Sequence, residues 1–294
     1  MTEIRAIVAP QDAGRKIKYY VRSNMRLSYQ AYCRIKAQEG LRVNGKIVHA
    51  NYELNAGDVI TASIPDNEPS KDVTPEDIPV NIVYMDEDVY IIDKTAPLAC
   101  QCTPKQPLGT LENGLKQRFS GDDNFVFRPL NRLDKGTSGL MAAARHAHSC
   151  QIMQKQLHSD AFIREYLAVC EGVLEGEGVI DLPIAKDASA TVRRVIDHEN
   201  GLPARTHYRA IRNDGKRTLV RLRLETGRTH QIRVHLSSMG YPICGDFLYG
   251  SEIPELSGRF ALHSYYIEFR HPMKDETISH TSVLPPELER LMKA

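Results

Sequence analysis

One carboxylate in this chain is set among cations in a turn-forming stretch. Asp134 lies in RPLNRLDKGTSGL (128–140), between Arg132 and Lys135 and two residues before Gly136. Such a carboxylate can act as a nucleophile, a general base, a metal ligand or a salt-bridge partner. The nucleophilic role requires that it is ionised and held by a cation. Because neighbours in an extended chain point to opposite faces, we expect that cation to come from elsewhere in the sequence.

A second dense stretch, ETGRTHQIRVHLSSMG (225–240), could supply the cation. It overlaps the end of a strand-like run, TLVRLRLET (218–226). Its later residues predict a helix, with Thr229 as N-cap and Gly240 as the stop. Arg228 would then lie at a strand–helix junction, from which its side chain could point into a cleft.

No metal or other cofactor is expected. His230 and His235 would lie about 140° apart on a helix, whereas two zinc ligands on one helix face are spaced three or four residues apart. Cys100 and Cys102 lack a second cysteine pair at metal-binding spacing.

Composition narrows the class of protein. The chain has 294 residues, of which 41% are hydrophobic, enough for a buried core and for about two domains. No run reaches the about 18 apolar residues that a membrane span requires, and the N-terminus has no signal-peptide core. Six cysteines in a chain of this length do not form a disulfide scaffold. We therefore expect a cytoplasmic protein without a membrane contact, with a monomer as the default.

Charge is distributed unevenly, although the net charge is only +1. Residues 1–64 carry ten Lys/Arg against five Asp/Glu, and residues 203–235 carry nine against two. Residues 65–78 carry five acids and one lysine. Two basic segments joined by an acidic one are typical of a protein that meets a polyanion at two places.

The pattern divides the chain into three blocks. In residues 1–64, a helix is predicted at 28–40 and a hairpin turn at Asn44-Gly45. Residues 65–79 contain four prolines and few apolar residues, and read as a linker. Residues 80–294 alternate strand-like and helical runs.

Within the third block, four elements can be predicted. Residues 80–94 read as two strands around an acidic turn, 146–159 as a helix and 163–172 as a strand. Residues 139–145, GLMAAAR, fit a strand or a helix equally well.

The first block resembles the small S-four-like RNA-binding domain, through its helix followed by LRVNGKIV and NAGDVITASIP. The resemblance implies a basic face for RNA phosphates, which would give affinity without base selectivity. That face would carry Arg15, Lys16, Lys18, Arg26, Arg34, Arg42 and Lys46.

The third block resembles the RluA-type RNA pseudouridine synthases. The matching pieces occur in the family's order and are RPLNRLDKGTSGL, IREYLAVCEG, ARTHYRAI, LRLETGRTHQIRVHLSSMGYPICGDFLYG and RFALHSYYIEFRHP. The resemblance implies an α+β fold: a small S-four-like domain, then a catalytic domain with a mixed, largely antiparallel sheet and flanking helices. It also implies isomerisation of uridine to pseudouridine in RNA, without a cofactor. Ribosomal RNA of the large subunit is the expected substrate, and transfer RNA the alternative.

Site roles follow from the same resemblance. Asp134 matches the carboxylate that attacks the target uridine. Tyr166 matches the tyrosine that stacks on the base, and Arg228 matches the arginine that pairs with the carboxylate. Leu262 matches a residue lining the base pocket. Arg132 matches a residue that enters the space left by the flipped-out base.

The chain departs from the family pattern at two positions. Asn131 stands where a histidine is expected, and Arg164 where a lysine is more usual. Asn131 and Lys135, which flank the motif, are still expected to contact the substrate. Two other functions remain open: a catalytically silent RNA-binding factor in ribosome assembly, and a hydrolase with Glu225 as second carboxylate.

Overall fold

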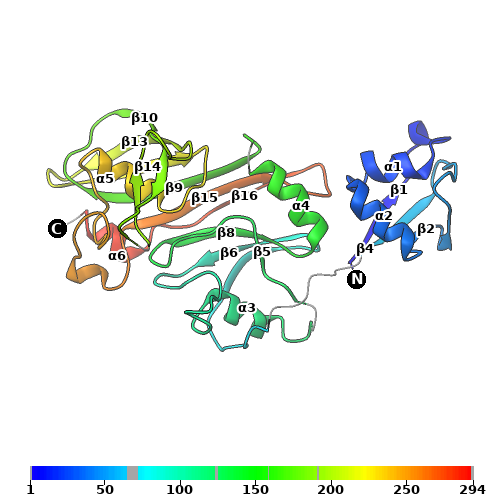
Figure 1. Ribbon diagram of the computed structural model, residues 1–294, viewed down its shortest axis with the longest axis horizontal. Helices are drawn as coiled ribbons and strands as arrows, with labels where there is room; N and C mark the ends of the chain where they lie inside the picture. The colour runs from blue at the N-terminus through cyan, green and yellow to red at the C-terminus, as the bar shows by residue number, and fades with distance from the viewer. Residues whose placement is uncertain (1, 65–71, 123–124, 158, 191, 293–294) are drawn as a thin grey trace.

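An N-terminal unit and a larger sheet domain make up the computed structural model, which describes residues 2–64, 72–122, 125–157, 159–190 and 192–292 (Figure 1). Residues 65–71 of the predicted linker (65–79) therefore lie outside the described residues. Residues 72–79 contain no helix or strand.

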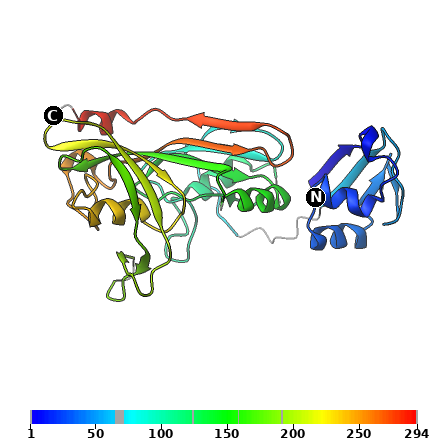
Figure 2. The same cartoon turned by 90° about the horizontal axis from the view of Figure 1, so that it is seen from above.

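The N-terminal unit is a four-stranded antiparallel sheet in the order β1-β4-β2-β3, with its helices packed on one face (Figure 2). Its elements are β1 (Thr2–Ile7), η1 (Pro10–Asp12), α1 (Ile17–Ser23), α2 (Tyr29–Ala37), β2 (Leu41–Val43), β3 (Lys46–Ile47) and β4 (Val59–Ile64). Ser28 caps α2 by accepting a hydrogen bond from the Ala31 amide at 3.1 Å. Asn44 and Gly45 form the β2–β3 turn with positive φ, as predicted. β1 and α1 were not anticipated.

The larger domain is built on a ten-stranded sheet whose main path runs β10-β13-β14-β9-β15-β8-β6-β5. β16 pairs with β15, and β7 pairs with β8. The strands are β5 (Asn81–Met85), β6 (Val89–Lys94), β7 (Arg128–Pro129), β8 (Ser138–Ala144), β9 (Phe162–Glu171), β10 (Glu177–Asp181), β13 (Arg205–Asn213), β14 (Arg217–Leu224), β15 (Leu262–Arg270) and β16 (Thr277–Thr281).

The sheet is mixed and largely antiparallel, as expected. Within it, β8 and β15 form a parallel pair, in which His263 lies opposite Ser138. The pattern of residues 139–145 fitted either a strand or a helix. In the structure, residues 139–144 belong to the strand β8, and every residue of β8 is buried. Gly139 has a φ of +102°, and a Cβ there would lie 2.2 Å from the Ser264 carbonyl oxygen. Only glycine therefore allows β8 and β15 to approach this closely.

Helices flank this sheet. They are α3 (Leu111–Arg118), α4 (Ala147–Gln156), α5 (Gln231–Ser238), η2 (Pro254–Leu256) and α6 (Pro286–Arg290), and a separate two-stranded sheet pairs β11 (Ile184–Lys186) with β12 (Arg194–Ile196). Figure 2 shows α4 and α5 on the same side of the sheet. The predicted N-cap of α5 was wrong: His230, not Thr229, holds that position, with a left-handed φ of 58°.

No helix among the described residues is long and apolar enough to cross a membrane.

Candidate active site

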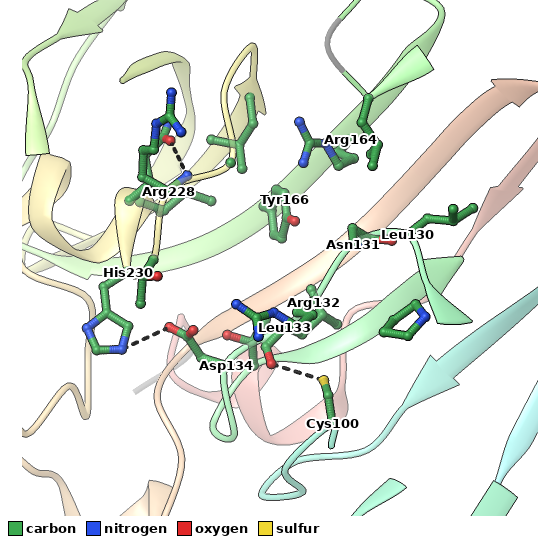
Figure 3. A pocket seen from close by; sticks show the side chains of 18 of the residues that line it. Cys100, Leu130, Asn131, Arg132, Leu133, Asp134, Arg164, Tyr166, Arg228 and His230 are labelled. Atoms are coloured by element: carbon green, nitrogen blue, oxygen red, sulfur yellow. Dashed lines mark hydrogen bonds and ion pairs between the residues drawn. The ribbon is translucent and has the colours of Figure 1, made fainter. Parts of the chain in front are cut away.

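A cleft of about 890 Å³ lies on the sheet between α4 and α5 and contains Asp134 (Figure 3). Its lining includes all seven residues expected at the catalytic and substrate-binding positions: Asn131, Arg132, Asp134, Lys135, Tyr166, Arg228 and Leu262. These residues come from separate parts of the sequence, and the fold brings them together in one cleft.

Asp134 lies in the loop between β7 and β8, and contacts on both sides hold that loop. The Cys100 thiol bonds to the Leu133 carbonyl at 3.1 Å. The Leu98 amide donates to the Lys135 carbonyl at 2.9 Å. Lys94 is almost fully buried and donates to Thr95 and Leu98 carbonyls at 2.9 and 2.8 Å, and to that of Lys135 at 3.5 Å. Burial lowers the pKa of Lys94 to about 8.

The cation beside Asp134 is Arg233, not Arg228. Arg233 Nη1 donates to Asp134 Oδ2 at 3.0 Å. Its Nε and Nη2 bond to the two oxygens of buried Asp246 at 2.7 and 2.8 Å. The guanidinium also lies 4.2 Å from the Phe260 ring centroid. Burial disfavours the charged form, but the two carboxylates outweigh it and raise the pKa of Arg233.

Arg228 lies three residues before α5, which begins at Gln231, and makes its hydrogen bonds away from Asp134. The Arg228 amide bonds to Gln231 Oε1 at 2.9 Å, and its Nε donates to the Pro203 carbonyl at 3.0 Å. Arg233, the third residue of α5, instead reaches Asp134. The expected Arg228–Asp134 pair is therefore replaced, although Arg228 stays exposed at the edge of the cleft.

Tyr166 and Leu262 form the floor of the cleft. Both are buried, at 5% and 4% exposure, and they lie on the neighbouring strands β9 and β15. Burial raises the pKa of Tyr166, so its phenol is neutral near pH 7. A bulge on β15 between Ser264 and Tyr266 disturbs the pairing next to Tyr166. Bulges of this kind often occur beside active sites, where they redirect side chains.

His230 is a site residue that the sequence did not point to. Its Nδ1 is 2.8 Å from the Tyr249 hydroxyl, and its Nε2 is 3.9 Å from Asp134 Oδ2. Burial lowers the pKa of His230, which favours the neutral imidazole. His235, in contrast, has both ring nitrogens occupied by Thr206 Oγ1 and the Leu182 carbonyl.

The residues flanking Asp134 differ in exposure. Arg132 and Lys135 are exposed, whereas Asn131 is buried. Asn131 Oδ1 accepts a hydrogen bond from the Ala142 amide at 2.9 Å, so this side chain ties the loop to β8.

The seven basic residues expected to bind RNA do not form one surface. Arg42 alternates with buried Leu41 and Val43, so it points away from the helices. Three others are engaged within the protein: Arg15 pairs with Asp12, Lys18 Nζ donates to Asn51 Oδ1 at 2.9 Å, and Arg26 Nη1 donates to the Pro272 carbonyl at 3.2 Å.

Sequence reasoning missed a groove between the N-terminal unit and α4. It has a volume of about 840 Å³. Its lining includes exposed Tyr19 and Tyr29, together with five cations, Arg15, Arg22, Arg26, Lys155 and Arg270. Exposed aromatic rings among cations are a common feature of surfaces that bind nucleic acid.

Comparison with known proteins identifies the family. Residues 88–238 match the family model described as RNA pseudouridylate synthase. The chain belongs to this family. It is 36% identical over 277 residues to ribosomal large subunit pseudouridine synthase D of Xanthomonas campestris pv. campestris, which covers 88% of this chain and 82% of the relative. The corresponding Haemophilus influenzae protein is 30% identical over 316 residues, 99% of this chain and 94% of the relative.

A solved structure supports the fold. Human RNA pseudouridylate synthase domain containing 4 aligns with a TM-score of 0.57 at 23% identity, over 72% of this chain and 92% of that chain. As a member of this family, the protein described here is an isomerase that acts on uridine in RNA. The family favours neither the hydrolase nor the catalytically silent alternative. Glu225, the second carboxylate of the hydrolase hypothesis, is bonded to His207 and lies 3.6 Å from Arg205.

Proposed function

We propose that Asp134 is the catalytic carboxylate of this RNA pseudouridine synthase, and that the reaction needs no cofactor. The observation that carries the proposal is the asymmetry of this side chain. Its Oδ2 is held by Arg233, whereas its Oδ1 makes no hydrogen bond with any of the described residues and the side chain keeps 28% exposure in the cleft. A carboxylate with one oxygen fixed by a neighbouring cation and the other open to the cleft suits attack on a bound nucleotide.

The isomerisation balances without an oxidant or an external group. The bond between N1 of uracil and C1′ of ribose breaks, the ring turns, and a bond forms between C5 and C1′. The proton on C5 is lost and N1 gains one. In the proposal, Asp134 assists bond cleavage, and Tyr166 with Leu262 holds the extruded base so that it turns within the cleft.

We further propose that the substrate is RNA of the large ribosomal subunit, with transfer RNA as the alternative. Support comes from the names of two relatives, each a ribosomal large subunit pseudouridine synthase D. The N-terminal unit, with its S-four-like pattern and the groove beside it, would anchor that RNA by its phosphates. A ribosomal RNA substrate would place the enzyme in the cytoplasm.

The test is pseudouridine mapping of total RNA from cells that lack the gene, complemented with variants. We expect one or more positions to be lost in the deletion and restored by the wild type, but not by Asp134→Ala. Asp275→Ala, an exposed carboxylate outside the cleft, is the matched control and should restore them. Restoration by Asp134→Ala would exclude the catalytic role of Asp134. No change at any position would favour the RNA-binding-only alternative.

A further inference from the structure

Arg164 is a buried cation without a partner among the described residues. The residue is 7% exposed, and its Nε has no hydrogen-bond partner. Its guanidinium makes no hydrogen bond or ion pair with any residue that the structure describes, and it lies 5.9 Å from the centroid of the Phe162 ring. Burying an unpaired charge is strongly unfavourable, so such groups survive mainly where function requires them.

The nearby carboxylates cannot serve Arg164. Glu165 follows it in sequence but points to the other side of β9, where Arg221 Nε and the Tyr265 hydroxyl bond to it at 3.0 and 3.1 Å. In the cleft that Arg164 lines, the carboxylates are Asp134 and Glu225. Both already have cationic or histidine partners, namely Arg233 and His207.

The guanidinium is held over the turn that leads to α5. A Cβ on Gly227 would lie 2.9 Å from Arg164 Nη1, so this position has room only for glycine while Arg164 keeps its place. Arg164 and Tyr166 are two residues apart on β9 and therefore project from the same face of the strand (Figure 3). At the usual rise along a strand, their Cα atoms are roughly 7 Å apart. A nucleotide whose base lies on Tyr166 could thus bring its own backbone to Arg164.

Asn131 adds a second unused donor on the same cleft. The residue is 6% exposed, and its Oδ1 must be the atom that accepts from the Ala142 amide, because that amide can only donate. This fixes the orientation of the side chain and leaves Nδ2 without a hydrogen-bond partner among the described residues. Arg164 and Asn131 both belong to the lining of the cleft, and each carries a buried nitrogen without an acceptor among the described residues.

We propose that Arg164 forms a phosphate-binding subsite for the phosphodiester next to the target uridine. A phosphate is the anion that RNA supplies at every nucleotide, and the planar guanidinium matches its geometry. The inference deepens the proposed function and rests on it. It makes Arg164 a residue that positions the substrate, while Asp134 carries the chemistry.

The test uses the full-length protein and a synthetic stem-loop RNA that contains a uridine found by the mapping. A methylphosphonate replaces the phosphate on either side of that uridine, one at a time, which removes one charge. For the wild type we expect kcat/KM to fall about tenfold or more at one of the two positions. Arg164→Gln should show the same loss on unmodified RNA and no further loss with that methylphosphonate.

Two further variants complete the test. Arg164→Lys, which keeps the charge, should recover part of the lost kcat/KM. Arg132→Gln is the matched control in the same cleft. Because Arg132 is expected to act independently of that phosphate, the fold-losses in kcat/KM from Arg132→Gln and from the methylphosphonate should multiply. The melting temperature of Arg164→Gln should not fall, because the side chain makes no hydrogen bond or ion pair with the residues that the structure describes.

Three results would overturn the inference. They are wild-type kcat/KM in Arg164→Gln, losses that multiply at both phosphate positions, or a strong drop in its melting temperature. A wild type that converts no RNA would overturn the proposed function as well, which distinguishes that failure from the failure of the subsite alone.

Discussion

Two arginines in the same motif, Arg228 and Arg233, are expected to behave very differently when substituted. Arg233→Gln leaves Asp246, which is fully buried, without its cation. Removing one partner of a buried ion pair typically costs about 3–5 kcal/mol. Arg228→Gln changes an exposed side chain and should alter the free energy of unfolding by no more than about 0.5 kcal/mol. Urea unfolding followed by circular dichroism measures both, and equal costs would contradict the assignment of the ion pair.

His263 should make stability depend on pH. Burial lowers the pKa of His263 to about 4, below the value near 6.5 expected in the unfolded chain. Between these values the unfolded state binds the proton and the folded state does not, so stability is lost as pH falls below about 6.5. By pH 5 the loss from this group is about 2 kcal/mol.

The measurement is the free energy of unfolding at pH 8 and at pH 5. His263→Asn should make the difference between the two about 2 kcal/mol smaller than in the wild type. The exposed His198→Asn is the matched control. If the free energy of unfolding changes between pH 8 and pH 5 by the same amount in His263→Asn as in the wild type, other groups cause the acid sensitivity.

At the scale of residues, the sequence predicted that Asp134 lies in the cleft, but it predicted the wrong arginine as its partner. Asp134, Tyr166 and Leu262 were predicted from their motifs, and the cleft brings them together. The predicted N-cap of α5 was Thr229, whereas the structure places it one residue later, at His230. Arg228 lies before the helix and bonds to the Pro203 carbonyl, whereas Arg233, the third residue of α5, faces the carboxylate. Local patterns do not show which arginine of a motif the tertiary packing brings to Asp134.

Among the elements, the loop carrying Asp134 should depend on Lys94. Lys94→Met keeps most of the side-chain volume but removes the donors to the Thr95, Leu98 and Lys135 carbonyls. We expect kcat to fall about 100-fold with little change in KM, because a displacement of about 1 Å at a reacting group has this effect. Kinetics on the mapped RNA over a range of concentrations give both constants. Lys186→Met, an exposed lysine, is the control, and an equal rise in KM would indicate a binding defect instead.

Elements with clear local signals were predicted well. The hairpin at Asn44-Gly45, the Ser28 cap and strand β9 all agree with the sequence. The segment that became β8 was ambiguous, because a strand buried on both faces loses the alternation that distinguishes it from a buried helix. α1 was missed because IKYYVRS is rich in β-branched and aromatic residues, and packing overrode that preference.

For the molecule as a whole, the groove beside α4 should carry more of the RNA affinity than the outer face of the N-terminal sheet. Arg22→Gln with Lys155→Gln should reduce the slope of log affinity against log salt by about 2, one for each cation–phosphate pair that the substitutions remove. The double substitution Arg42→Gln with Lys46→Gln, on β2 and β3, is the matched control. It should change the slope of log affinity against log salt less. Filter binding of the mapped RNA at several salt concentrations measures the slopes. The opposite ranking would place the RNA on the sheet side.

The arrangement of the sheet could not be predicted from the local patterns. The strands pair in the order β14-β9-β15-β8-β6, so neighbours in space are often far apart in the chain. Strand propensity sets which residues are extended but not which strands they join. The family resemblance supplied the sheet type, whereas the pairing of β8 with β15 came only from the structure.

The position of β15 has a consequence for how the enzyme is made. This strand, residues 262–270, separates β8, which follows Asp134, from β9, which carries Tyr166. During translation, the ribosome must therefore release most of the chain before the two halves of the cleft can be joined. Until then the nascent protein presents the unpaired edges of β8 and β9, which are open to chaperones and to wrong pairing. The enzyme can begin to act only once β15 has been synthesised and has joined these two edges.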